Sequence, residues 1–133
     1  MAPDDKFVII GAGQAGGRAA ETMRTQGFTG KVTIVGEEAY PPYERPALSK
    51  RVLTGEDDPD STYVHKPAYY DEHQIELKLG VSAMTIDRST KSVSLSNGTS
   101  LDYTKLMIAT GSQLRRLSLP GSDLTGIHYL RGI

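Results

Sequence analysis

Three glycines near the start of the chain have the spacing of a site that binds the phosphates of a dinucleotide. They are Gly11, Gly13 and Gly16, in the pattern G-x-G-x-x-G. In this pattern the first glycine allows a tight turn, the second lets phosphate oxygens approach the backbone, and the third lets a helix lie close to the preceding strand. The free N–H groups and the positive dipole end of that helix would then face the anion.

An acidic residue stands where the sugar of such a dinucleotide needs a hydrogen-bond acceptor. Glu37 follows Gly16 by about 20 residues, the separation at which this motif places an acid that binds the ribose hydroxyls. The alternative interpretation is an ordinary strand-helix-strand turn with a surface glutamate, since glycine-rich turns are common.

The segments around these residues have the order that the motif requires. Residues 7–10 are an apolar run of strand length that stops at Gly11, and residues 31–35 predict a second strand before Gly36. Between them, alanines recur at helical spacing and predict a helix over about residues 14–26 that Gly27 ends. The polar residues expected on its outward face are Arg18, Glu21, Arg24 and Thr25.

In the rest of the chain, the boundaries of the predicted elements follow from prolines and from a change to alternating apolar and polar residues. Three prolines within residues 40–46 predict a shaped loop, and Pro46 suits the start of a short helix over residues 47–53 that ends at Gly55. An acidic turn over residues 56–61 and a second short helix over residues 66–73 follow. Alternation of apolar and polar residues then predicts strands over residues 75–79, 82–88, 92–95, 99–103 and 105–109.

This order predicts an α/β fold. It comprises a Rossmann-like parallel sheet with helices on one face and an antiparallel β-meander on the other. Leu106, Met107 and Ile108 are interpreted as core residues, and residues 112–133 as a loop with a turn at Leu119-Pro120-Gly121.

Composition excludes several classes of function. The net charge of −1, with scattered signs, gives no reason to expect nucleic acid or an anionic membrane as a partner. The chain has no cysteine, which removes disulfides, thiolate nucleophiles and cysteine-ligated metals and is compatible with the cytoplasm. The short acidic start predicts neither a signal peptide nor a membrane span. His65, His73 and His128 lack metal-ligand spacing, so no metal site is expected.

Four stretches together resemble the amino-terminal flavin-binding part of the NAD(P)H-dependent ferredoxin and rubredoxin reductases, which are flavoproteins with two dinucleotide-binding domains. The stretches are residues 8–16, Val35-Gly-Glu-Glu38, Pro42-Tyr-Glu-Arg-Pro-Ala-Leu-Ser-Lys50 and Leu106-Met-Ile-Ala-Thr-Gly111. The third is the most specific, because its Arg-Pro-x-Leu-Ser-Lys segment is much rarer than a glycine-rich turn.

The resemblance implies a set of residues that would contact FAD. The pyrophosphate and the adenosine ribose would meet Gly11, Gly13, Ala15, Gly16 and Glu37. The remaining contacts would come from Arg45, Lys50, Ala83, Ala109, Thr110, Gly111 and Arg131. The adenine would meet the backbone at Ala83, where the family usually has valine, and a backbone contact survives that change.

Arg45 and Lys50 carry positive charges that suit an anionic ligand. Arg45 would offer a planar charged fork to the pyrophosphate, and Lys50 a mobile point charge. A cation near the isoalloxazine favours the anionic reduced flavin, which makes Lys50 the candidate catalytic residue. The alternative for Lys50 is a solvated lysine on a helix surface.

The implied activity is transfer of electrons from NAD(P)H through FAD to a ferredoxin-type iron–sulfur protein. Residues 1–133 would form only the amino-terminal portion of the FAD-binding domain, without the NAD-binding and carboxy-terminal domains. We therefore expect little turnover by this chain alone, and an unpaired sheet edge that invites self-association. The alternatives are a non-catalytic module that binds ADP-ribose, NAD or AMP, and a folding fragment that binds nothing.

Overall fold

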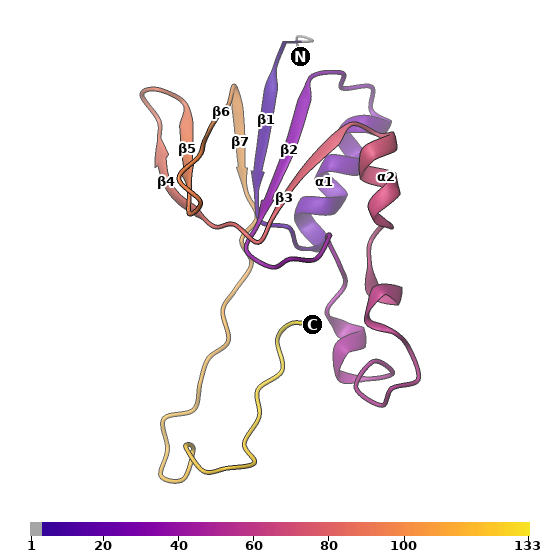
Figure 1. The fold of residues 1–133 in the computed structure, drawn as a ribbon, viewed down its shortest axis with the longest axis vertical. Coiled ribbons are helices and arrows are strands. Elements are labelled where there is room, and N and C mark those ends of the chain that lie inside the picture. The colour runs from indigo at the N-terminus through magenta and orange to yellow at the C-terminus, as the bar shows by residue number, and fades with distance from the viewer. Residues whose placement is uncertain (1–3) are drawn as a thin grey trace.

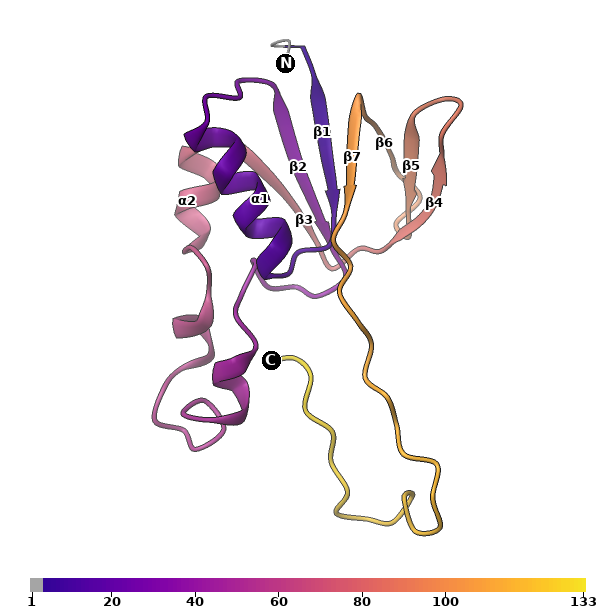
Figure 2. The ribbon, with the colours of Figure 1, turned by 180° about the vertical axis from the view of Figure 1, so that it is seen from behind.

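The computed structural model describes residues 4–133 and contains two sheets (Figures 1 and 2). The larger sheet is parallel, in the order β3-β2-β1-β7. Its strands are β1 (Lys6–Ile10), β2 (Lys31–Gly36), β3 (Ile75–Leu79) and β7 (Lys105–Ile108). The smaller sheet is an antiparallel meander of β4 (Ala83–Asp87), β5 (Ser92–Leu95) and β6 (Ser100–Asp102). The predicted fold class is confirmed.

Helices cover one face of the parallel sheet, and the meander covers the other (Figures 1 and 2). The helices are α1 (Gln14–Thr25) and α2 (Pro67–Glu72), and two 3-10 turns, η1 (Pro46–Ser49) and η2 (Pro59–Thr62), lie between β2 and α2. Because side chains alternate along a strand, Ile9 packs toward the helices while Val8 and Ile10 pack toward the meander. Burial on both faces explains why β1 is a continuous apolar run.

The first helix begins and ends as the sequence predicts. Gly13 is its N-cap residue, with extended backbone and no side chain to cap the helix. Gly27 follows the helix with a φ of +82°, the left-handed conformation that a glycine adopts without strain. Gly16, Gly17 and Ala20 form the buried face of α1, which lets the helix lie close to the sheet.

Arg24 contradicts the prediction that it faces outward. Its guanidinium donates hydrogen bonds of 2.7–2.8 Å to four main-chain carbonyls, those of Phe28, Gly30, His73 and Gln74. These carbonyls belong to the turn after α1 and to the turn between α2 and β3. Arg24 thus joins two connections that are distant in sequence.

We predict that Arg24→Ala lowers the free energy of unfolding by about 2–3 kcal/mol, because it leaves partly buried carbonyls without donors. Urea denaturation measures this change. Arg18→Ala is the matched control: Arg18 is exposed on the same helix, so its surface ion pairs are expected to contribute at most about 1 kcal/mol. Equal losses in the two variants would contradict the structural role of Arg24.

The helix predicted for residues 47–53 is shorter than expected. The 3-10 turn η1 ends at Ser49, since the backbone of Lys50 leaves the helical region, with φ −127° and ψ −117°. Hydrogen-bonded turns then carry the chain to Gly55, whose φ is +76°. The second predicted short helix, α2, is confirmed.

Strand β7 lies at an edge of the parallel sheet within the described part of the chain. Leu106 and Met107 pack against the two cores, but Ile108 is 63% exposed, so its interpretation as a core residue is wrong. Ile108 is the last residue of β7, at the edge of the sheet. Self-association through this edge stays a prediction.

Residues 112–133, which we call the returning segment, contain neither helix nor strand, as predicted. The segment leaves the end of β7, runs away from both sheets and then turns back (Figures 1 and 2). A turn around Gly121, with a φ of +86°, begins this reversal. Its last residues therefore reach the end of the parallel sheet at which the strands stop.

Candidate functional site

A cavity of about 770 Å³ opens at the carboxyl ends of β1, β2 and β7. In open α/β sheets this is the position at which ligands bind. Ten of the residues predicted to contact a dinucleotide line it: Gly11, Gly13, Ala15, Glu37, Arg45, Ala83, Ala109, Thr110, Gly111 and Arg131. The fold thus brings together residues from both ends of the sequence.

Gly11 lies where three strands converge. Its N–H donates a 2.8 Å hydrogen bond to the carbonyl of Val35, and the N–H of Ala109 donates one of 2.7 Å to Ile10. The φ of Gly11 is +120°, and a Cβ there would lie 2.2 Å from the carbonyl oxygen of Ala109. Only glycine fits this turn, which brings β1, β2 and β7 together below the cavity.

The other two glycines differ in what surrounds them. Gly13 lines the cavity, and a Cβ there would meet no atom within 4 Å. Gly16 does not line the cavity: it faces the preceding turn, and a Cβ there would lie 2.1 Å from the carbonyl oxygen of Gly11. Gly13 therefore leaves open space beside the helix N-terminus, and Gly16 lets α1 approach β1.

The start of α1 has the properties of an anion site. The first N–H groups of a helix have no partner within the helix, and the N-cap residue Gly13 has no side chain to satisfy them. Gln14 and Ala15, in the first turn, line the cavity. A phosphate placed there would accept hydrogen bonds from these groups and meet the positive end of the helix dipole.

The predicted ribose-binding and adenine-binding positions lie around the same cavity. Glu37 follows the last residue of β2, is exposed and lines the cavity. Ala83 opens β4 and also lines it, next to Val81 and Ser82.

Lys50, which was predicted to contact the flavin, lies outside the cavity lining. It is exposed, it follows the 3-10 turn η1, and it does not line the cavity. Pro46, four residues earlier in the same segment, does line it. The rare Arg-Pro-x-Leu-Ser-Lys segment therefore reaches the cavity through its first residues.

Sequence reasoning missed two polar residues of the cavity wall, Glu38 and Tyr43. The Tyr43 hydroxyl donates a short hydrogen bond to the Glu38 carboxylate, and Arg45 forms an ion pair with the same carboxylate. Arg45 also donates a 2.7 Å hydrogen bond to the Tyr43 hydroxyl and another to the main-chain oxygen of Arg131. The second acid in Glu37-Glu38 was the sequence signal that could have indicated this group.

The protonation states in this group follow from its contacts. Burial raises the pKa of Glu38, but hydrogen bonds from Tyr43 and Arg45 outweigh it, so that the pKa lies below the usual value for glutamate. Burial and the hydrogen bond to Glu38 raise the pKa of Tyr43 to about 12. At neutral pH Glu38 is therefore a carboxylate acceptor, and Tyr43 is a neutral donor.

Arg131 reaches the cavity from the other direction. Its guanidinium donates a hydrogen bond to the carbonyl of Ser112 and lies beside Gly111, at 3.5 Å from the position of a Cβ on that glycine. The two ends of the returning segment therefore meet at the cavity.

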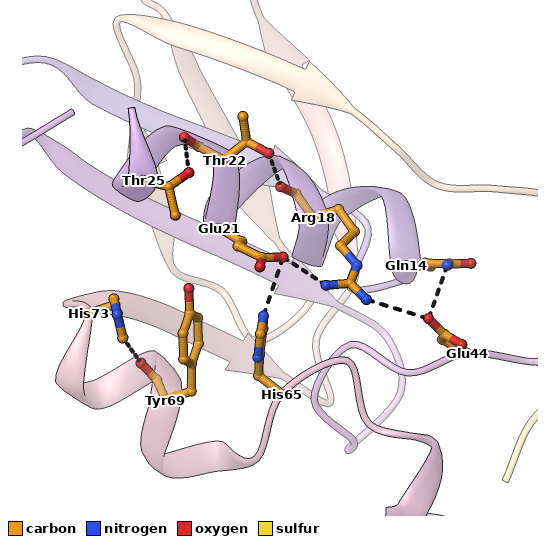
Figure 3. Close-up of polar contacts among 9 residues, drawn as sticks. All are labelled: Gln14, Arg18, Glu21, Thr22, Thr25, Glu44, His65, Tyr69 and His73. Carbon is orange, nitrogen blue, oxygen red and sulfur yellow. Dashed lines mark hydrogen bonds and ion pairs between the residues drawn. The ribbon is translucent and has the colours of Figure 1, made fainter. Parts of the chain in front are cut away.

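A chain of polar contacts leads from the cavity along α1 to α2 (Figure 3). The amide of Gln14 donates to Glu44, whose carboxylate lies 3.6 Å from Arg18. Arg18 in turn pairs with Glu21 at 2.9 Å, and Glu21 lies 3.3 Å from His65 Nε2. The hydrogen bond from Arg18, and then the neighbouring His65 ring, lower the pKa of Glu21. Glu21 is half-buried by these contacts and does not simply face outward as predicted.

His65 packs inside this arrangement. Its ring stacks on Tyr69 at 3.8 Å, and Tyr69 stacks on His73 at 3.9 Å.

Within residues 4–133 no three His, Cys, Asp or Glu side chains group as a metal site would require. No helix in the described part of the chain is long and apolar enough to span a membrane.

Residues 5–133 match the protein family described as pyridine nucleotide-disulphide oxidoreductase. The chain belongs to this family. Curated relatives within the pyridine nucleotide-disulphide oxidoreductases include rhodocoxin reductase of Rhodococcus erythropolis, which is 44% identical over 94% of this chain and 29% of the relative. The ferredoxin–NAD(+) reductase component of the p-cumate 2,3-dioxygenase system of Pseudomonas putida is 44% identical over 95% of this chain and 31% of the relative.

Solved structures of pyridine nucleotide-disulphide oxidoreductases share the fold. The ferredoxin reductase for the CYP199A2 system from Rhodopseudomonas palustris superposes with a TM-score of 0.88 at 34% identity, over 96% of this chain and 31% of that one. Putidaredoxin reductase, in its covalent complex with putidaredoxin, gives 0.81 at 36% identity, over 90% and 28%. The resemblance to ferredoxin and rubredoxin reductases is confirmed, and the chain spans about a third of the length of these relatives.

Proposed function

We propose that residues 1–133 are the amino-terminal portion of the FAD-binding domain of an oxidoreductase. Its reaction passes electrons from NAD(P)H through FAD to a ferredoxin-type iron–sulfur protein. The proposal is supported by relatives that are named as ferredoxin–NAD(+) reductases and by the cavity at the carboxyl ends of the strands. The observation that carries it is the open space at Gly13 beside the uncapped start of α1.

The residues present fit the dinucleotide part of FAD. The N–H groups at the start of α1 would hold the pyrophosphate, and Glu37 would accept hydrogen bonds from the adenosine ribose. Arg131 would add positive charge from the returning segment, and the main chain at Ala83 would border the adenine. When bound, FAD would supply the redox chemistry. Lys50 is not assigned a contact, because it does not line the cavity.

The second candidate is a module that binds a nucleotide without catalysis. It is favoured by one observation: the proposed contacts in the cavity serve the phosphates, ribose and adenine, which ADP, NAD and FAD share. Only the affinity for the flavin part distinguishes the two candidates.

Titration of the purified chain with FAD and with ADP tests the proposal. Flavin absorbance after purification, followed by calorimetric titration, is expected to show tighter binding of FAD than of ADP. Equal affinities would favour the nucleotide module. If neither ligand binds or raises the melting temperature, both candidates fail for this chain.

We predict that Glu37→Ala weakens the binding of FAD and of ADP about tenfold, because the ribose loses a charged hydrogen-bond acceptor. Calorimetric titration measures the dissociation constants. Glu72→Ala removes the same charge at the exposed end of α2 and is expected to leave both constants unchanged. An unchanged affinity in Glu37→Ala would remove Glu37 from the site.

A further inference from the structure

We propose that Glu38 and Tyr43 are positioning residues that hold Arg45 against the main chain at Arg131. We call Glu38, Tyr43 and Arg45 the clamp. It fixes residues 129–133 at the cavity, so that Arg131 is positioned for the phosphates. The role assigned to Arg131 rests on the proposed function, whereas the clamp itself is independent of it.

The contacts of Arg45 carry the first step of this inference. One terminal nitrogen pairs with the Glu38 carboxylate, and the other donates both to the Tyr43 hydroxyl and to the Arg131 carbonyl. The guanidinium also lies 4.9 Å from the centre of the Tyr43 ring. Arg45 is thus directed toward protein groups, and its planar fork suits this bracing role better than a lysine would.

The burial of Tyr43 makes the clamp rigid. The Tyr43 residue is 3% exposed, so its hydroxyl has a fixed position from which it orients both Glu38 and Arg45. Gly132 packs directly on the clamp: a Cβ there would lie 3.0 Å from Glu38 Oε2 and 3.3 Å from the Tyr43 hydroxyl. The backbone of Ile133 also hydrogen-bonds Tyr43 and acts to lower its pKa.

The returning segment depends on these contacts because it lacks regular structure. Its other described hydrogen bonds at this end, from Arg131 to Ser112 and from Leu117 to the Tyr129 hydroxyl, join the segment to itself. Within the described residues, the side chains that bond residues 129–133 to the rest of the fold are those of Arg45 and Tyr43. Removing the clamp should therefore loosen the attachment of residues 129–133 to the rest of the fold.

The clamp also gives Arg45 and Arg131 different roles. Arg45 forms an ion pair with Glu38, whereas Arg131 forms none among residues 4–133 and acts on Glu38 only from a longer distance, where its charge helps to lower the pKa of that carboxyl. An anion in the cavity would therefore gain more from Arg131 than from Arg45. In this division Arg45 positions and Arg131 binds.

Limited trypsin digestion of the full chain tests the clamp without any ligand. Trypsin cleaves after arginine, and Arg88 is exposed in the turn between β4 and β5, outside the returning segment, so it serves as an internal reference. In Tyr43→Phe the initial rate of cleavage after Arg131, relative to that after Arg88, is expected to rise at least threefold. Tyr40→Phe, which removes a hydroxyl from the same loop outside the clamp, is expected to leave the ratio unchanged.

Glu38→Gln is a second variant that keeps the shape of the side chain but removes the charge that Arg45 faces. It is expected to raise the cleavage ratio as well, with a melting temperature near that of the wild type. An unchanged ratio in both Tyr43→Phe and Glu38→Gln would overturn the clamp.

FAD titration tests whether the clamp positions Arg131 for ligand binding. Tyr43→Phe and Arg45→Lys are both expected to weaken FAD binding roughly fivefold, because Arg131 is less well preorganised for the phosphates. Full affinity in variants with a raised cleavage ratio would overturn the positioning role. If the wild type binds neither FAD nor ADP, the proposed function fails and the digestion still decides whether the clamp exists.

Discussion

Replacing Gly11 by alanine is expected to lower the free energy of unfolding by about 4 kcal/mol. Two effects add. A φ of +120° strains any residue with a Cβ, at roughly 1–3 kcal/mol. The new Cβ would also overlap the carbonyl oxygen of Ala109, and such overpacking costs about 1–3 kcal/mol. Since small domains are stable by only about 5–15 kcal/mol, Gly11→Ala should leave a marginally folded protein.

Thermal unfolding followed by circular dichroism measures this effect. A fall in melting temperature of roughly 10–20 °C is expected for Gly11→Ala. Gly13→Ala makes the same chemical change two residues later, where φ is −88° and the space is open. It is expected to lose about 1 kcal/mol or less. Similar melting temperatures for the two variants would show that β1 and β7 do not approach as closely as the structure has them.

Gly13→Val is expected to separate binding from folding. The extended backbone of Gly13 accommodates valine, so the fold should lose only about 1 kcal/mol, for a poorer N-cap residue. The branched side chain would fill the space in which a phosphate meets the helix N-terminus. We expect FAD and ADP to bind at least about 100-fold more weakly, which corresponds to about 2.7 kcal/mol.

Calorimetric titration and thermal unfolding on one preparation of Gly13→Val measure both quantities. Ala19→Val is a suitable control, since it adds the same kind of side chain to α1 on a half-buried position outside the cavity lining. It is expected to change stability and to leave affinity alone. Wild-type affinity in Gly13→Val would exclude the start of α1 as the phosphate site.

Local patterns were enough to predict most of the fold. The spacing of the glycines, the stop at Gly27 and the alternation after Ile75 each depend on residues close together in the chain. For that reason the strands, both α-helices and the meander were predicted correctly. Glu37 could be placed because its separation from Gly16 is fixed by one helix and one strand.

Features that depend on distant partners could not be predicted. Arg24 is typical of an exposed helix position until the turns at Phe28 and His73 fold against it. Ile108 has the apolar character of a core residue, yet it ends an edge strand and is exposed. Glu38 and Tyr43 gain their role only when Arg131 returns to them. Such contacts are set by the tertiary fold and leave no periodic signal in the sequence.

The pairing of β1 with β7 also has a consequence for how the protein folds. Phe7 pairs with Lys105, and the hydrogen bonds between Lys6 and Thr104 span 98 residues of sequence. Closing so long a loop costs entropy before its contacts form, and folds with high contact order are slow to assemble. During synthesis the turn at Gly11 is completed only after its neighbour Ala109 has emerged. The cavity should therefore form well after β1, α1 and β2 have been made.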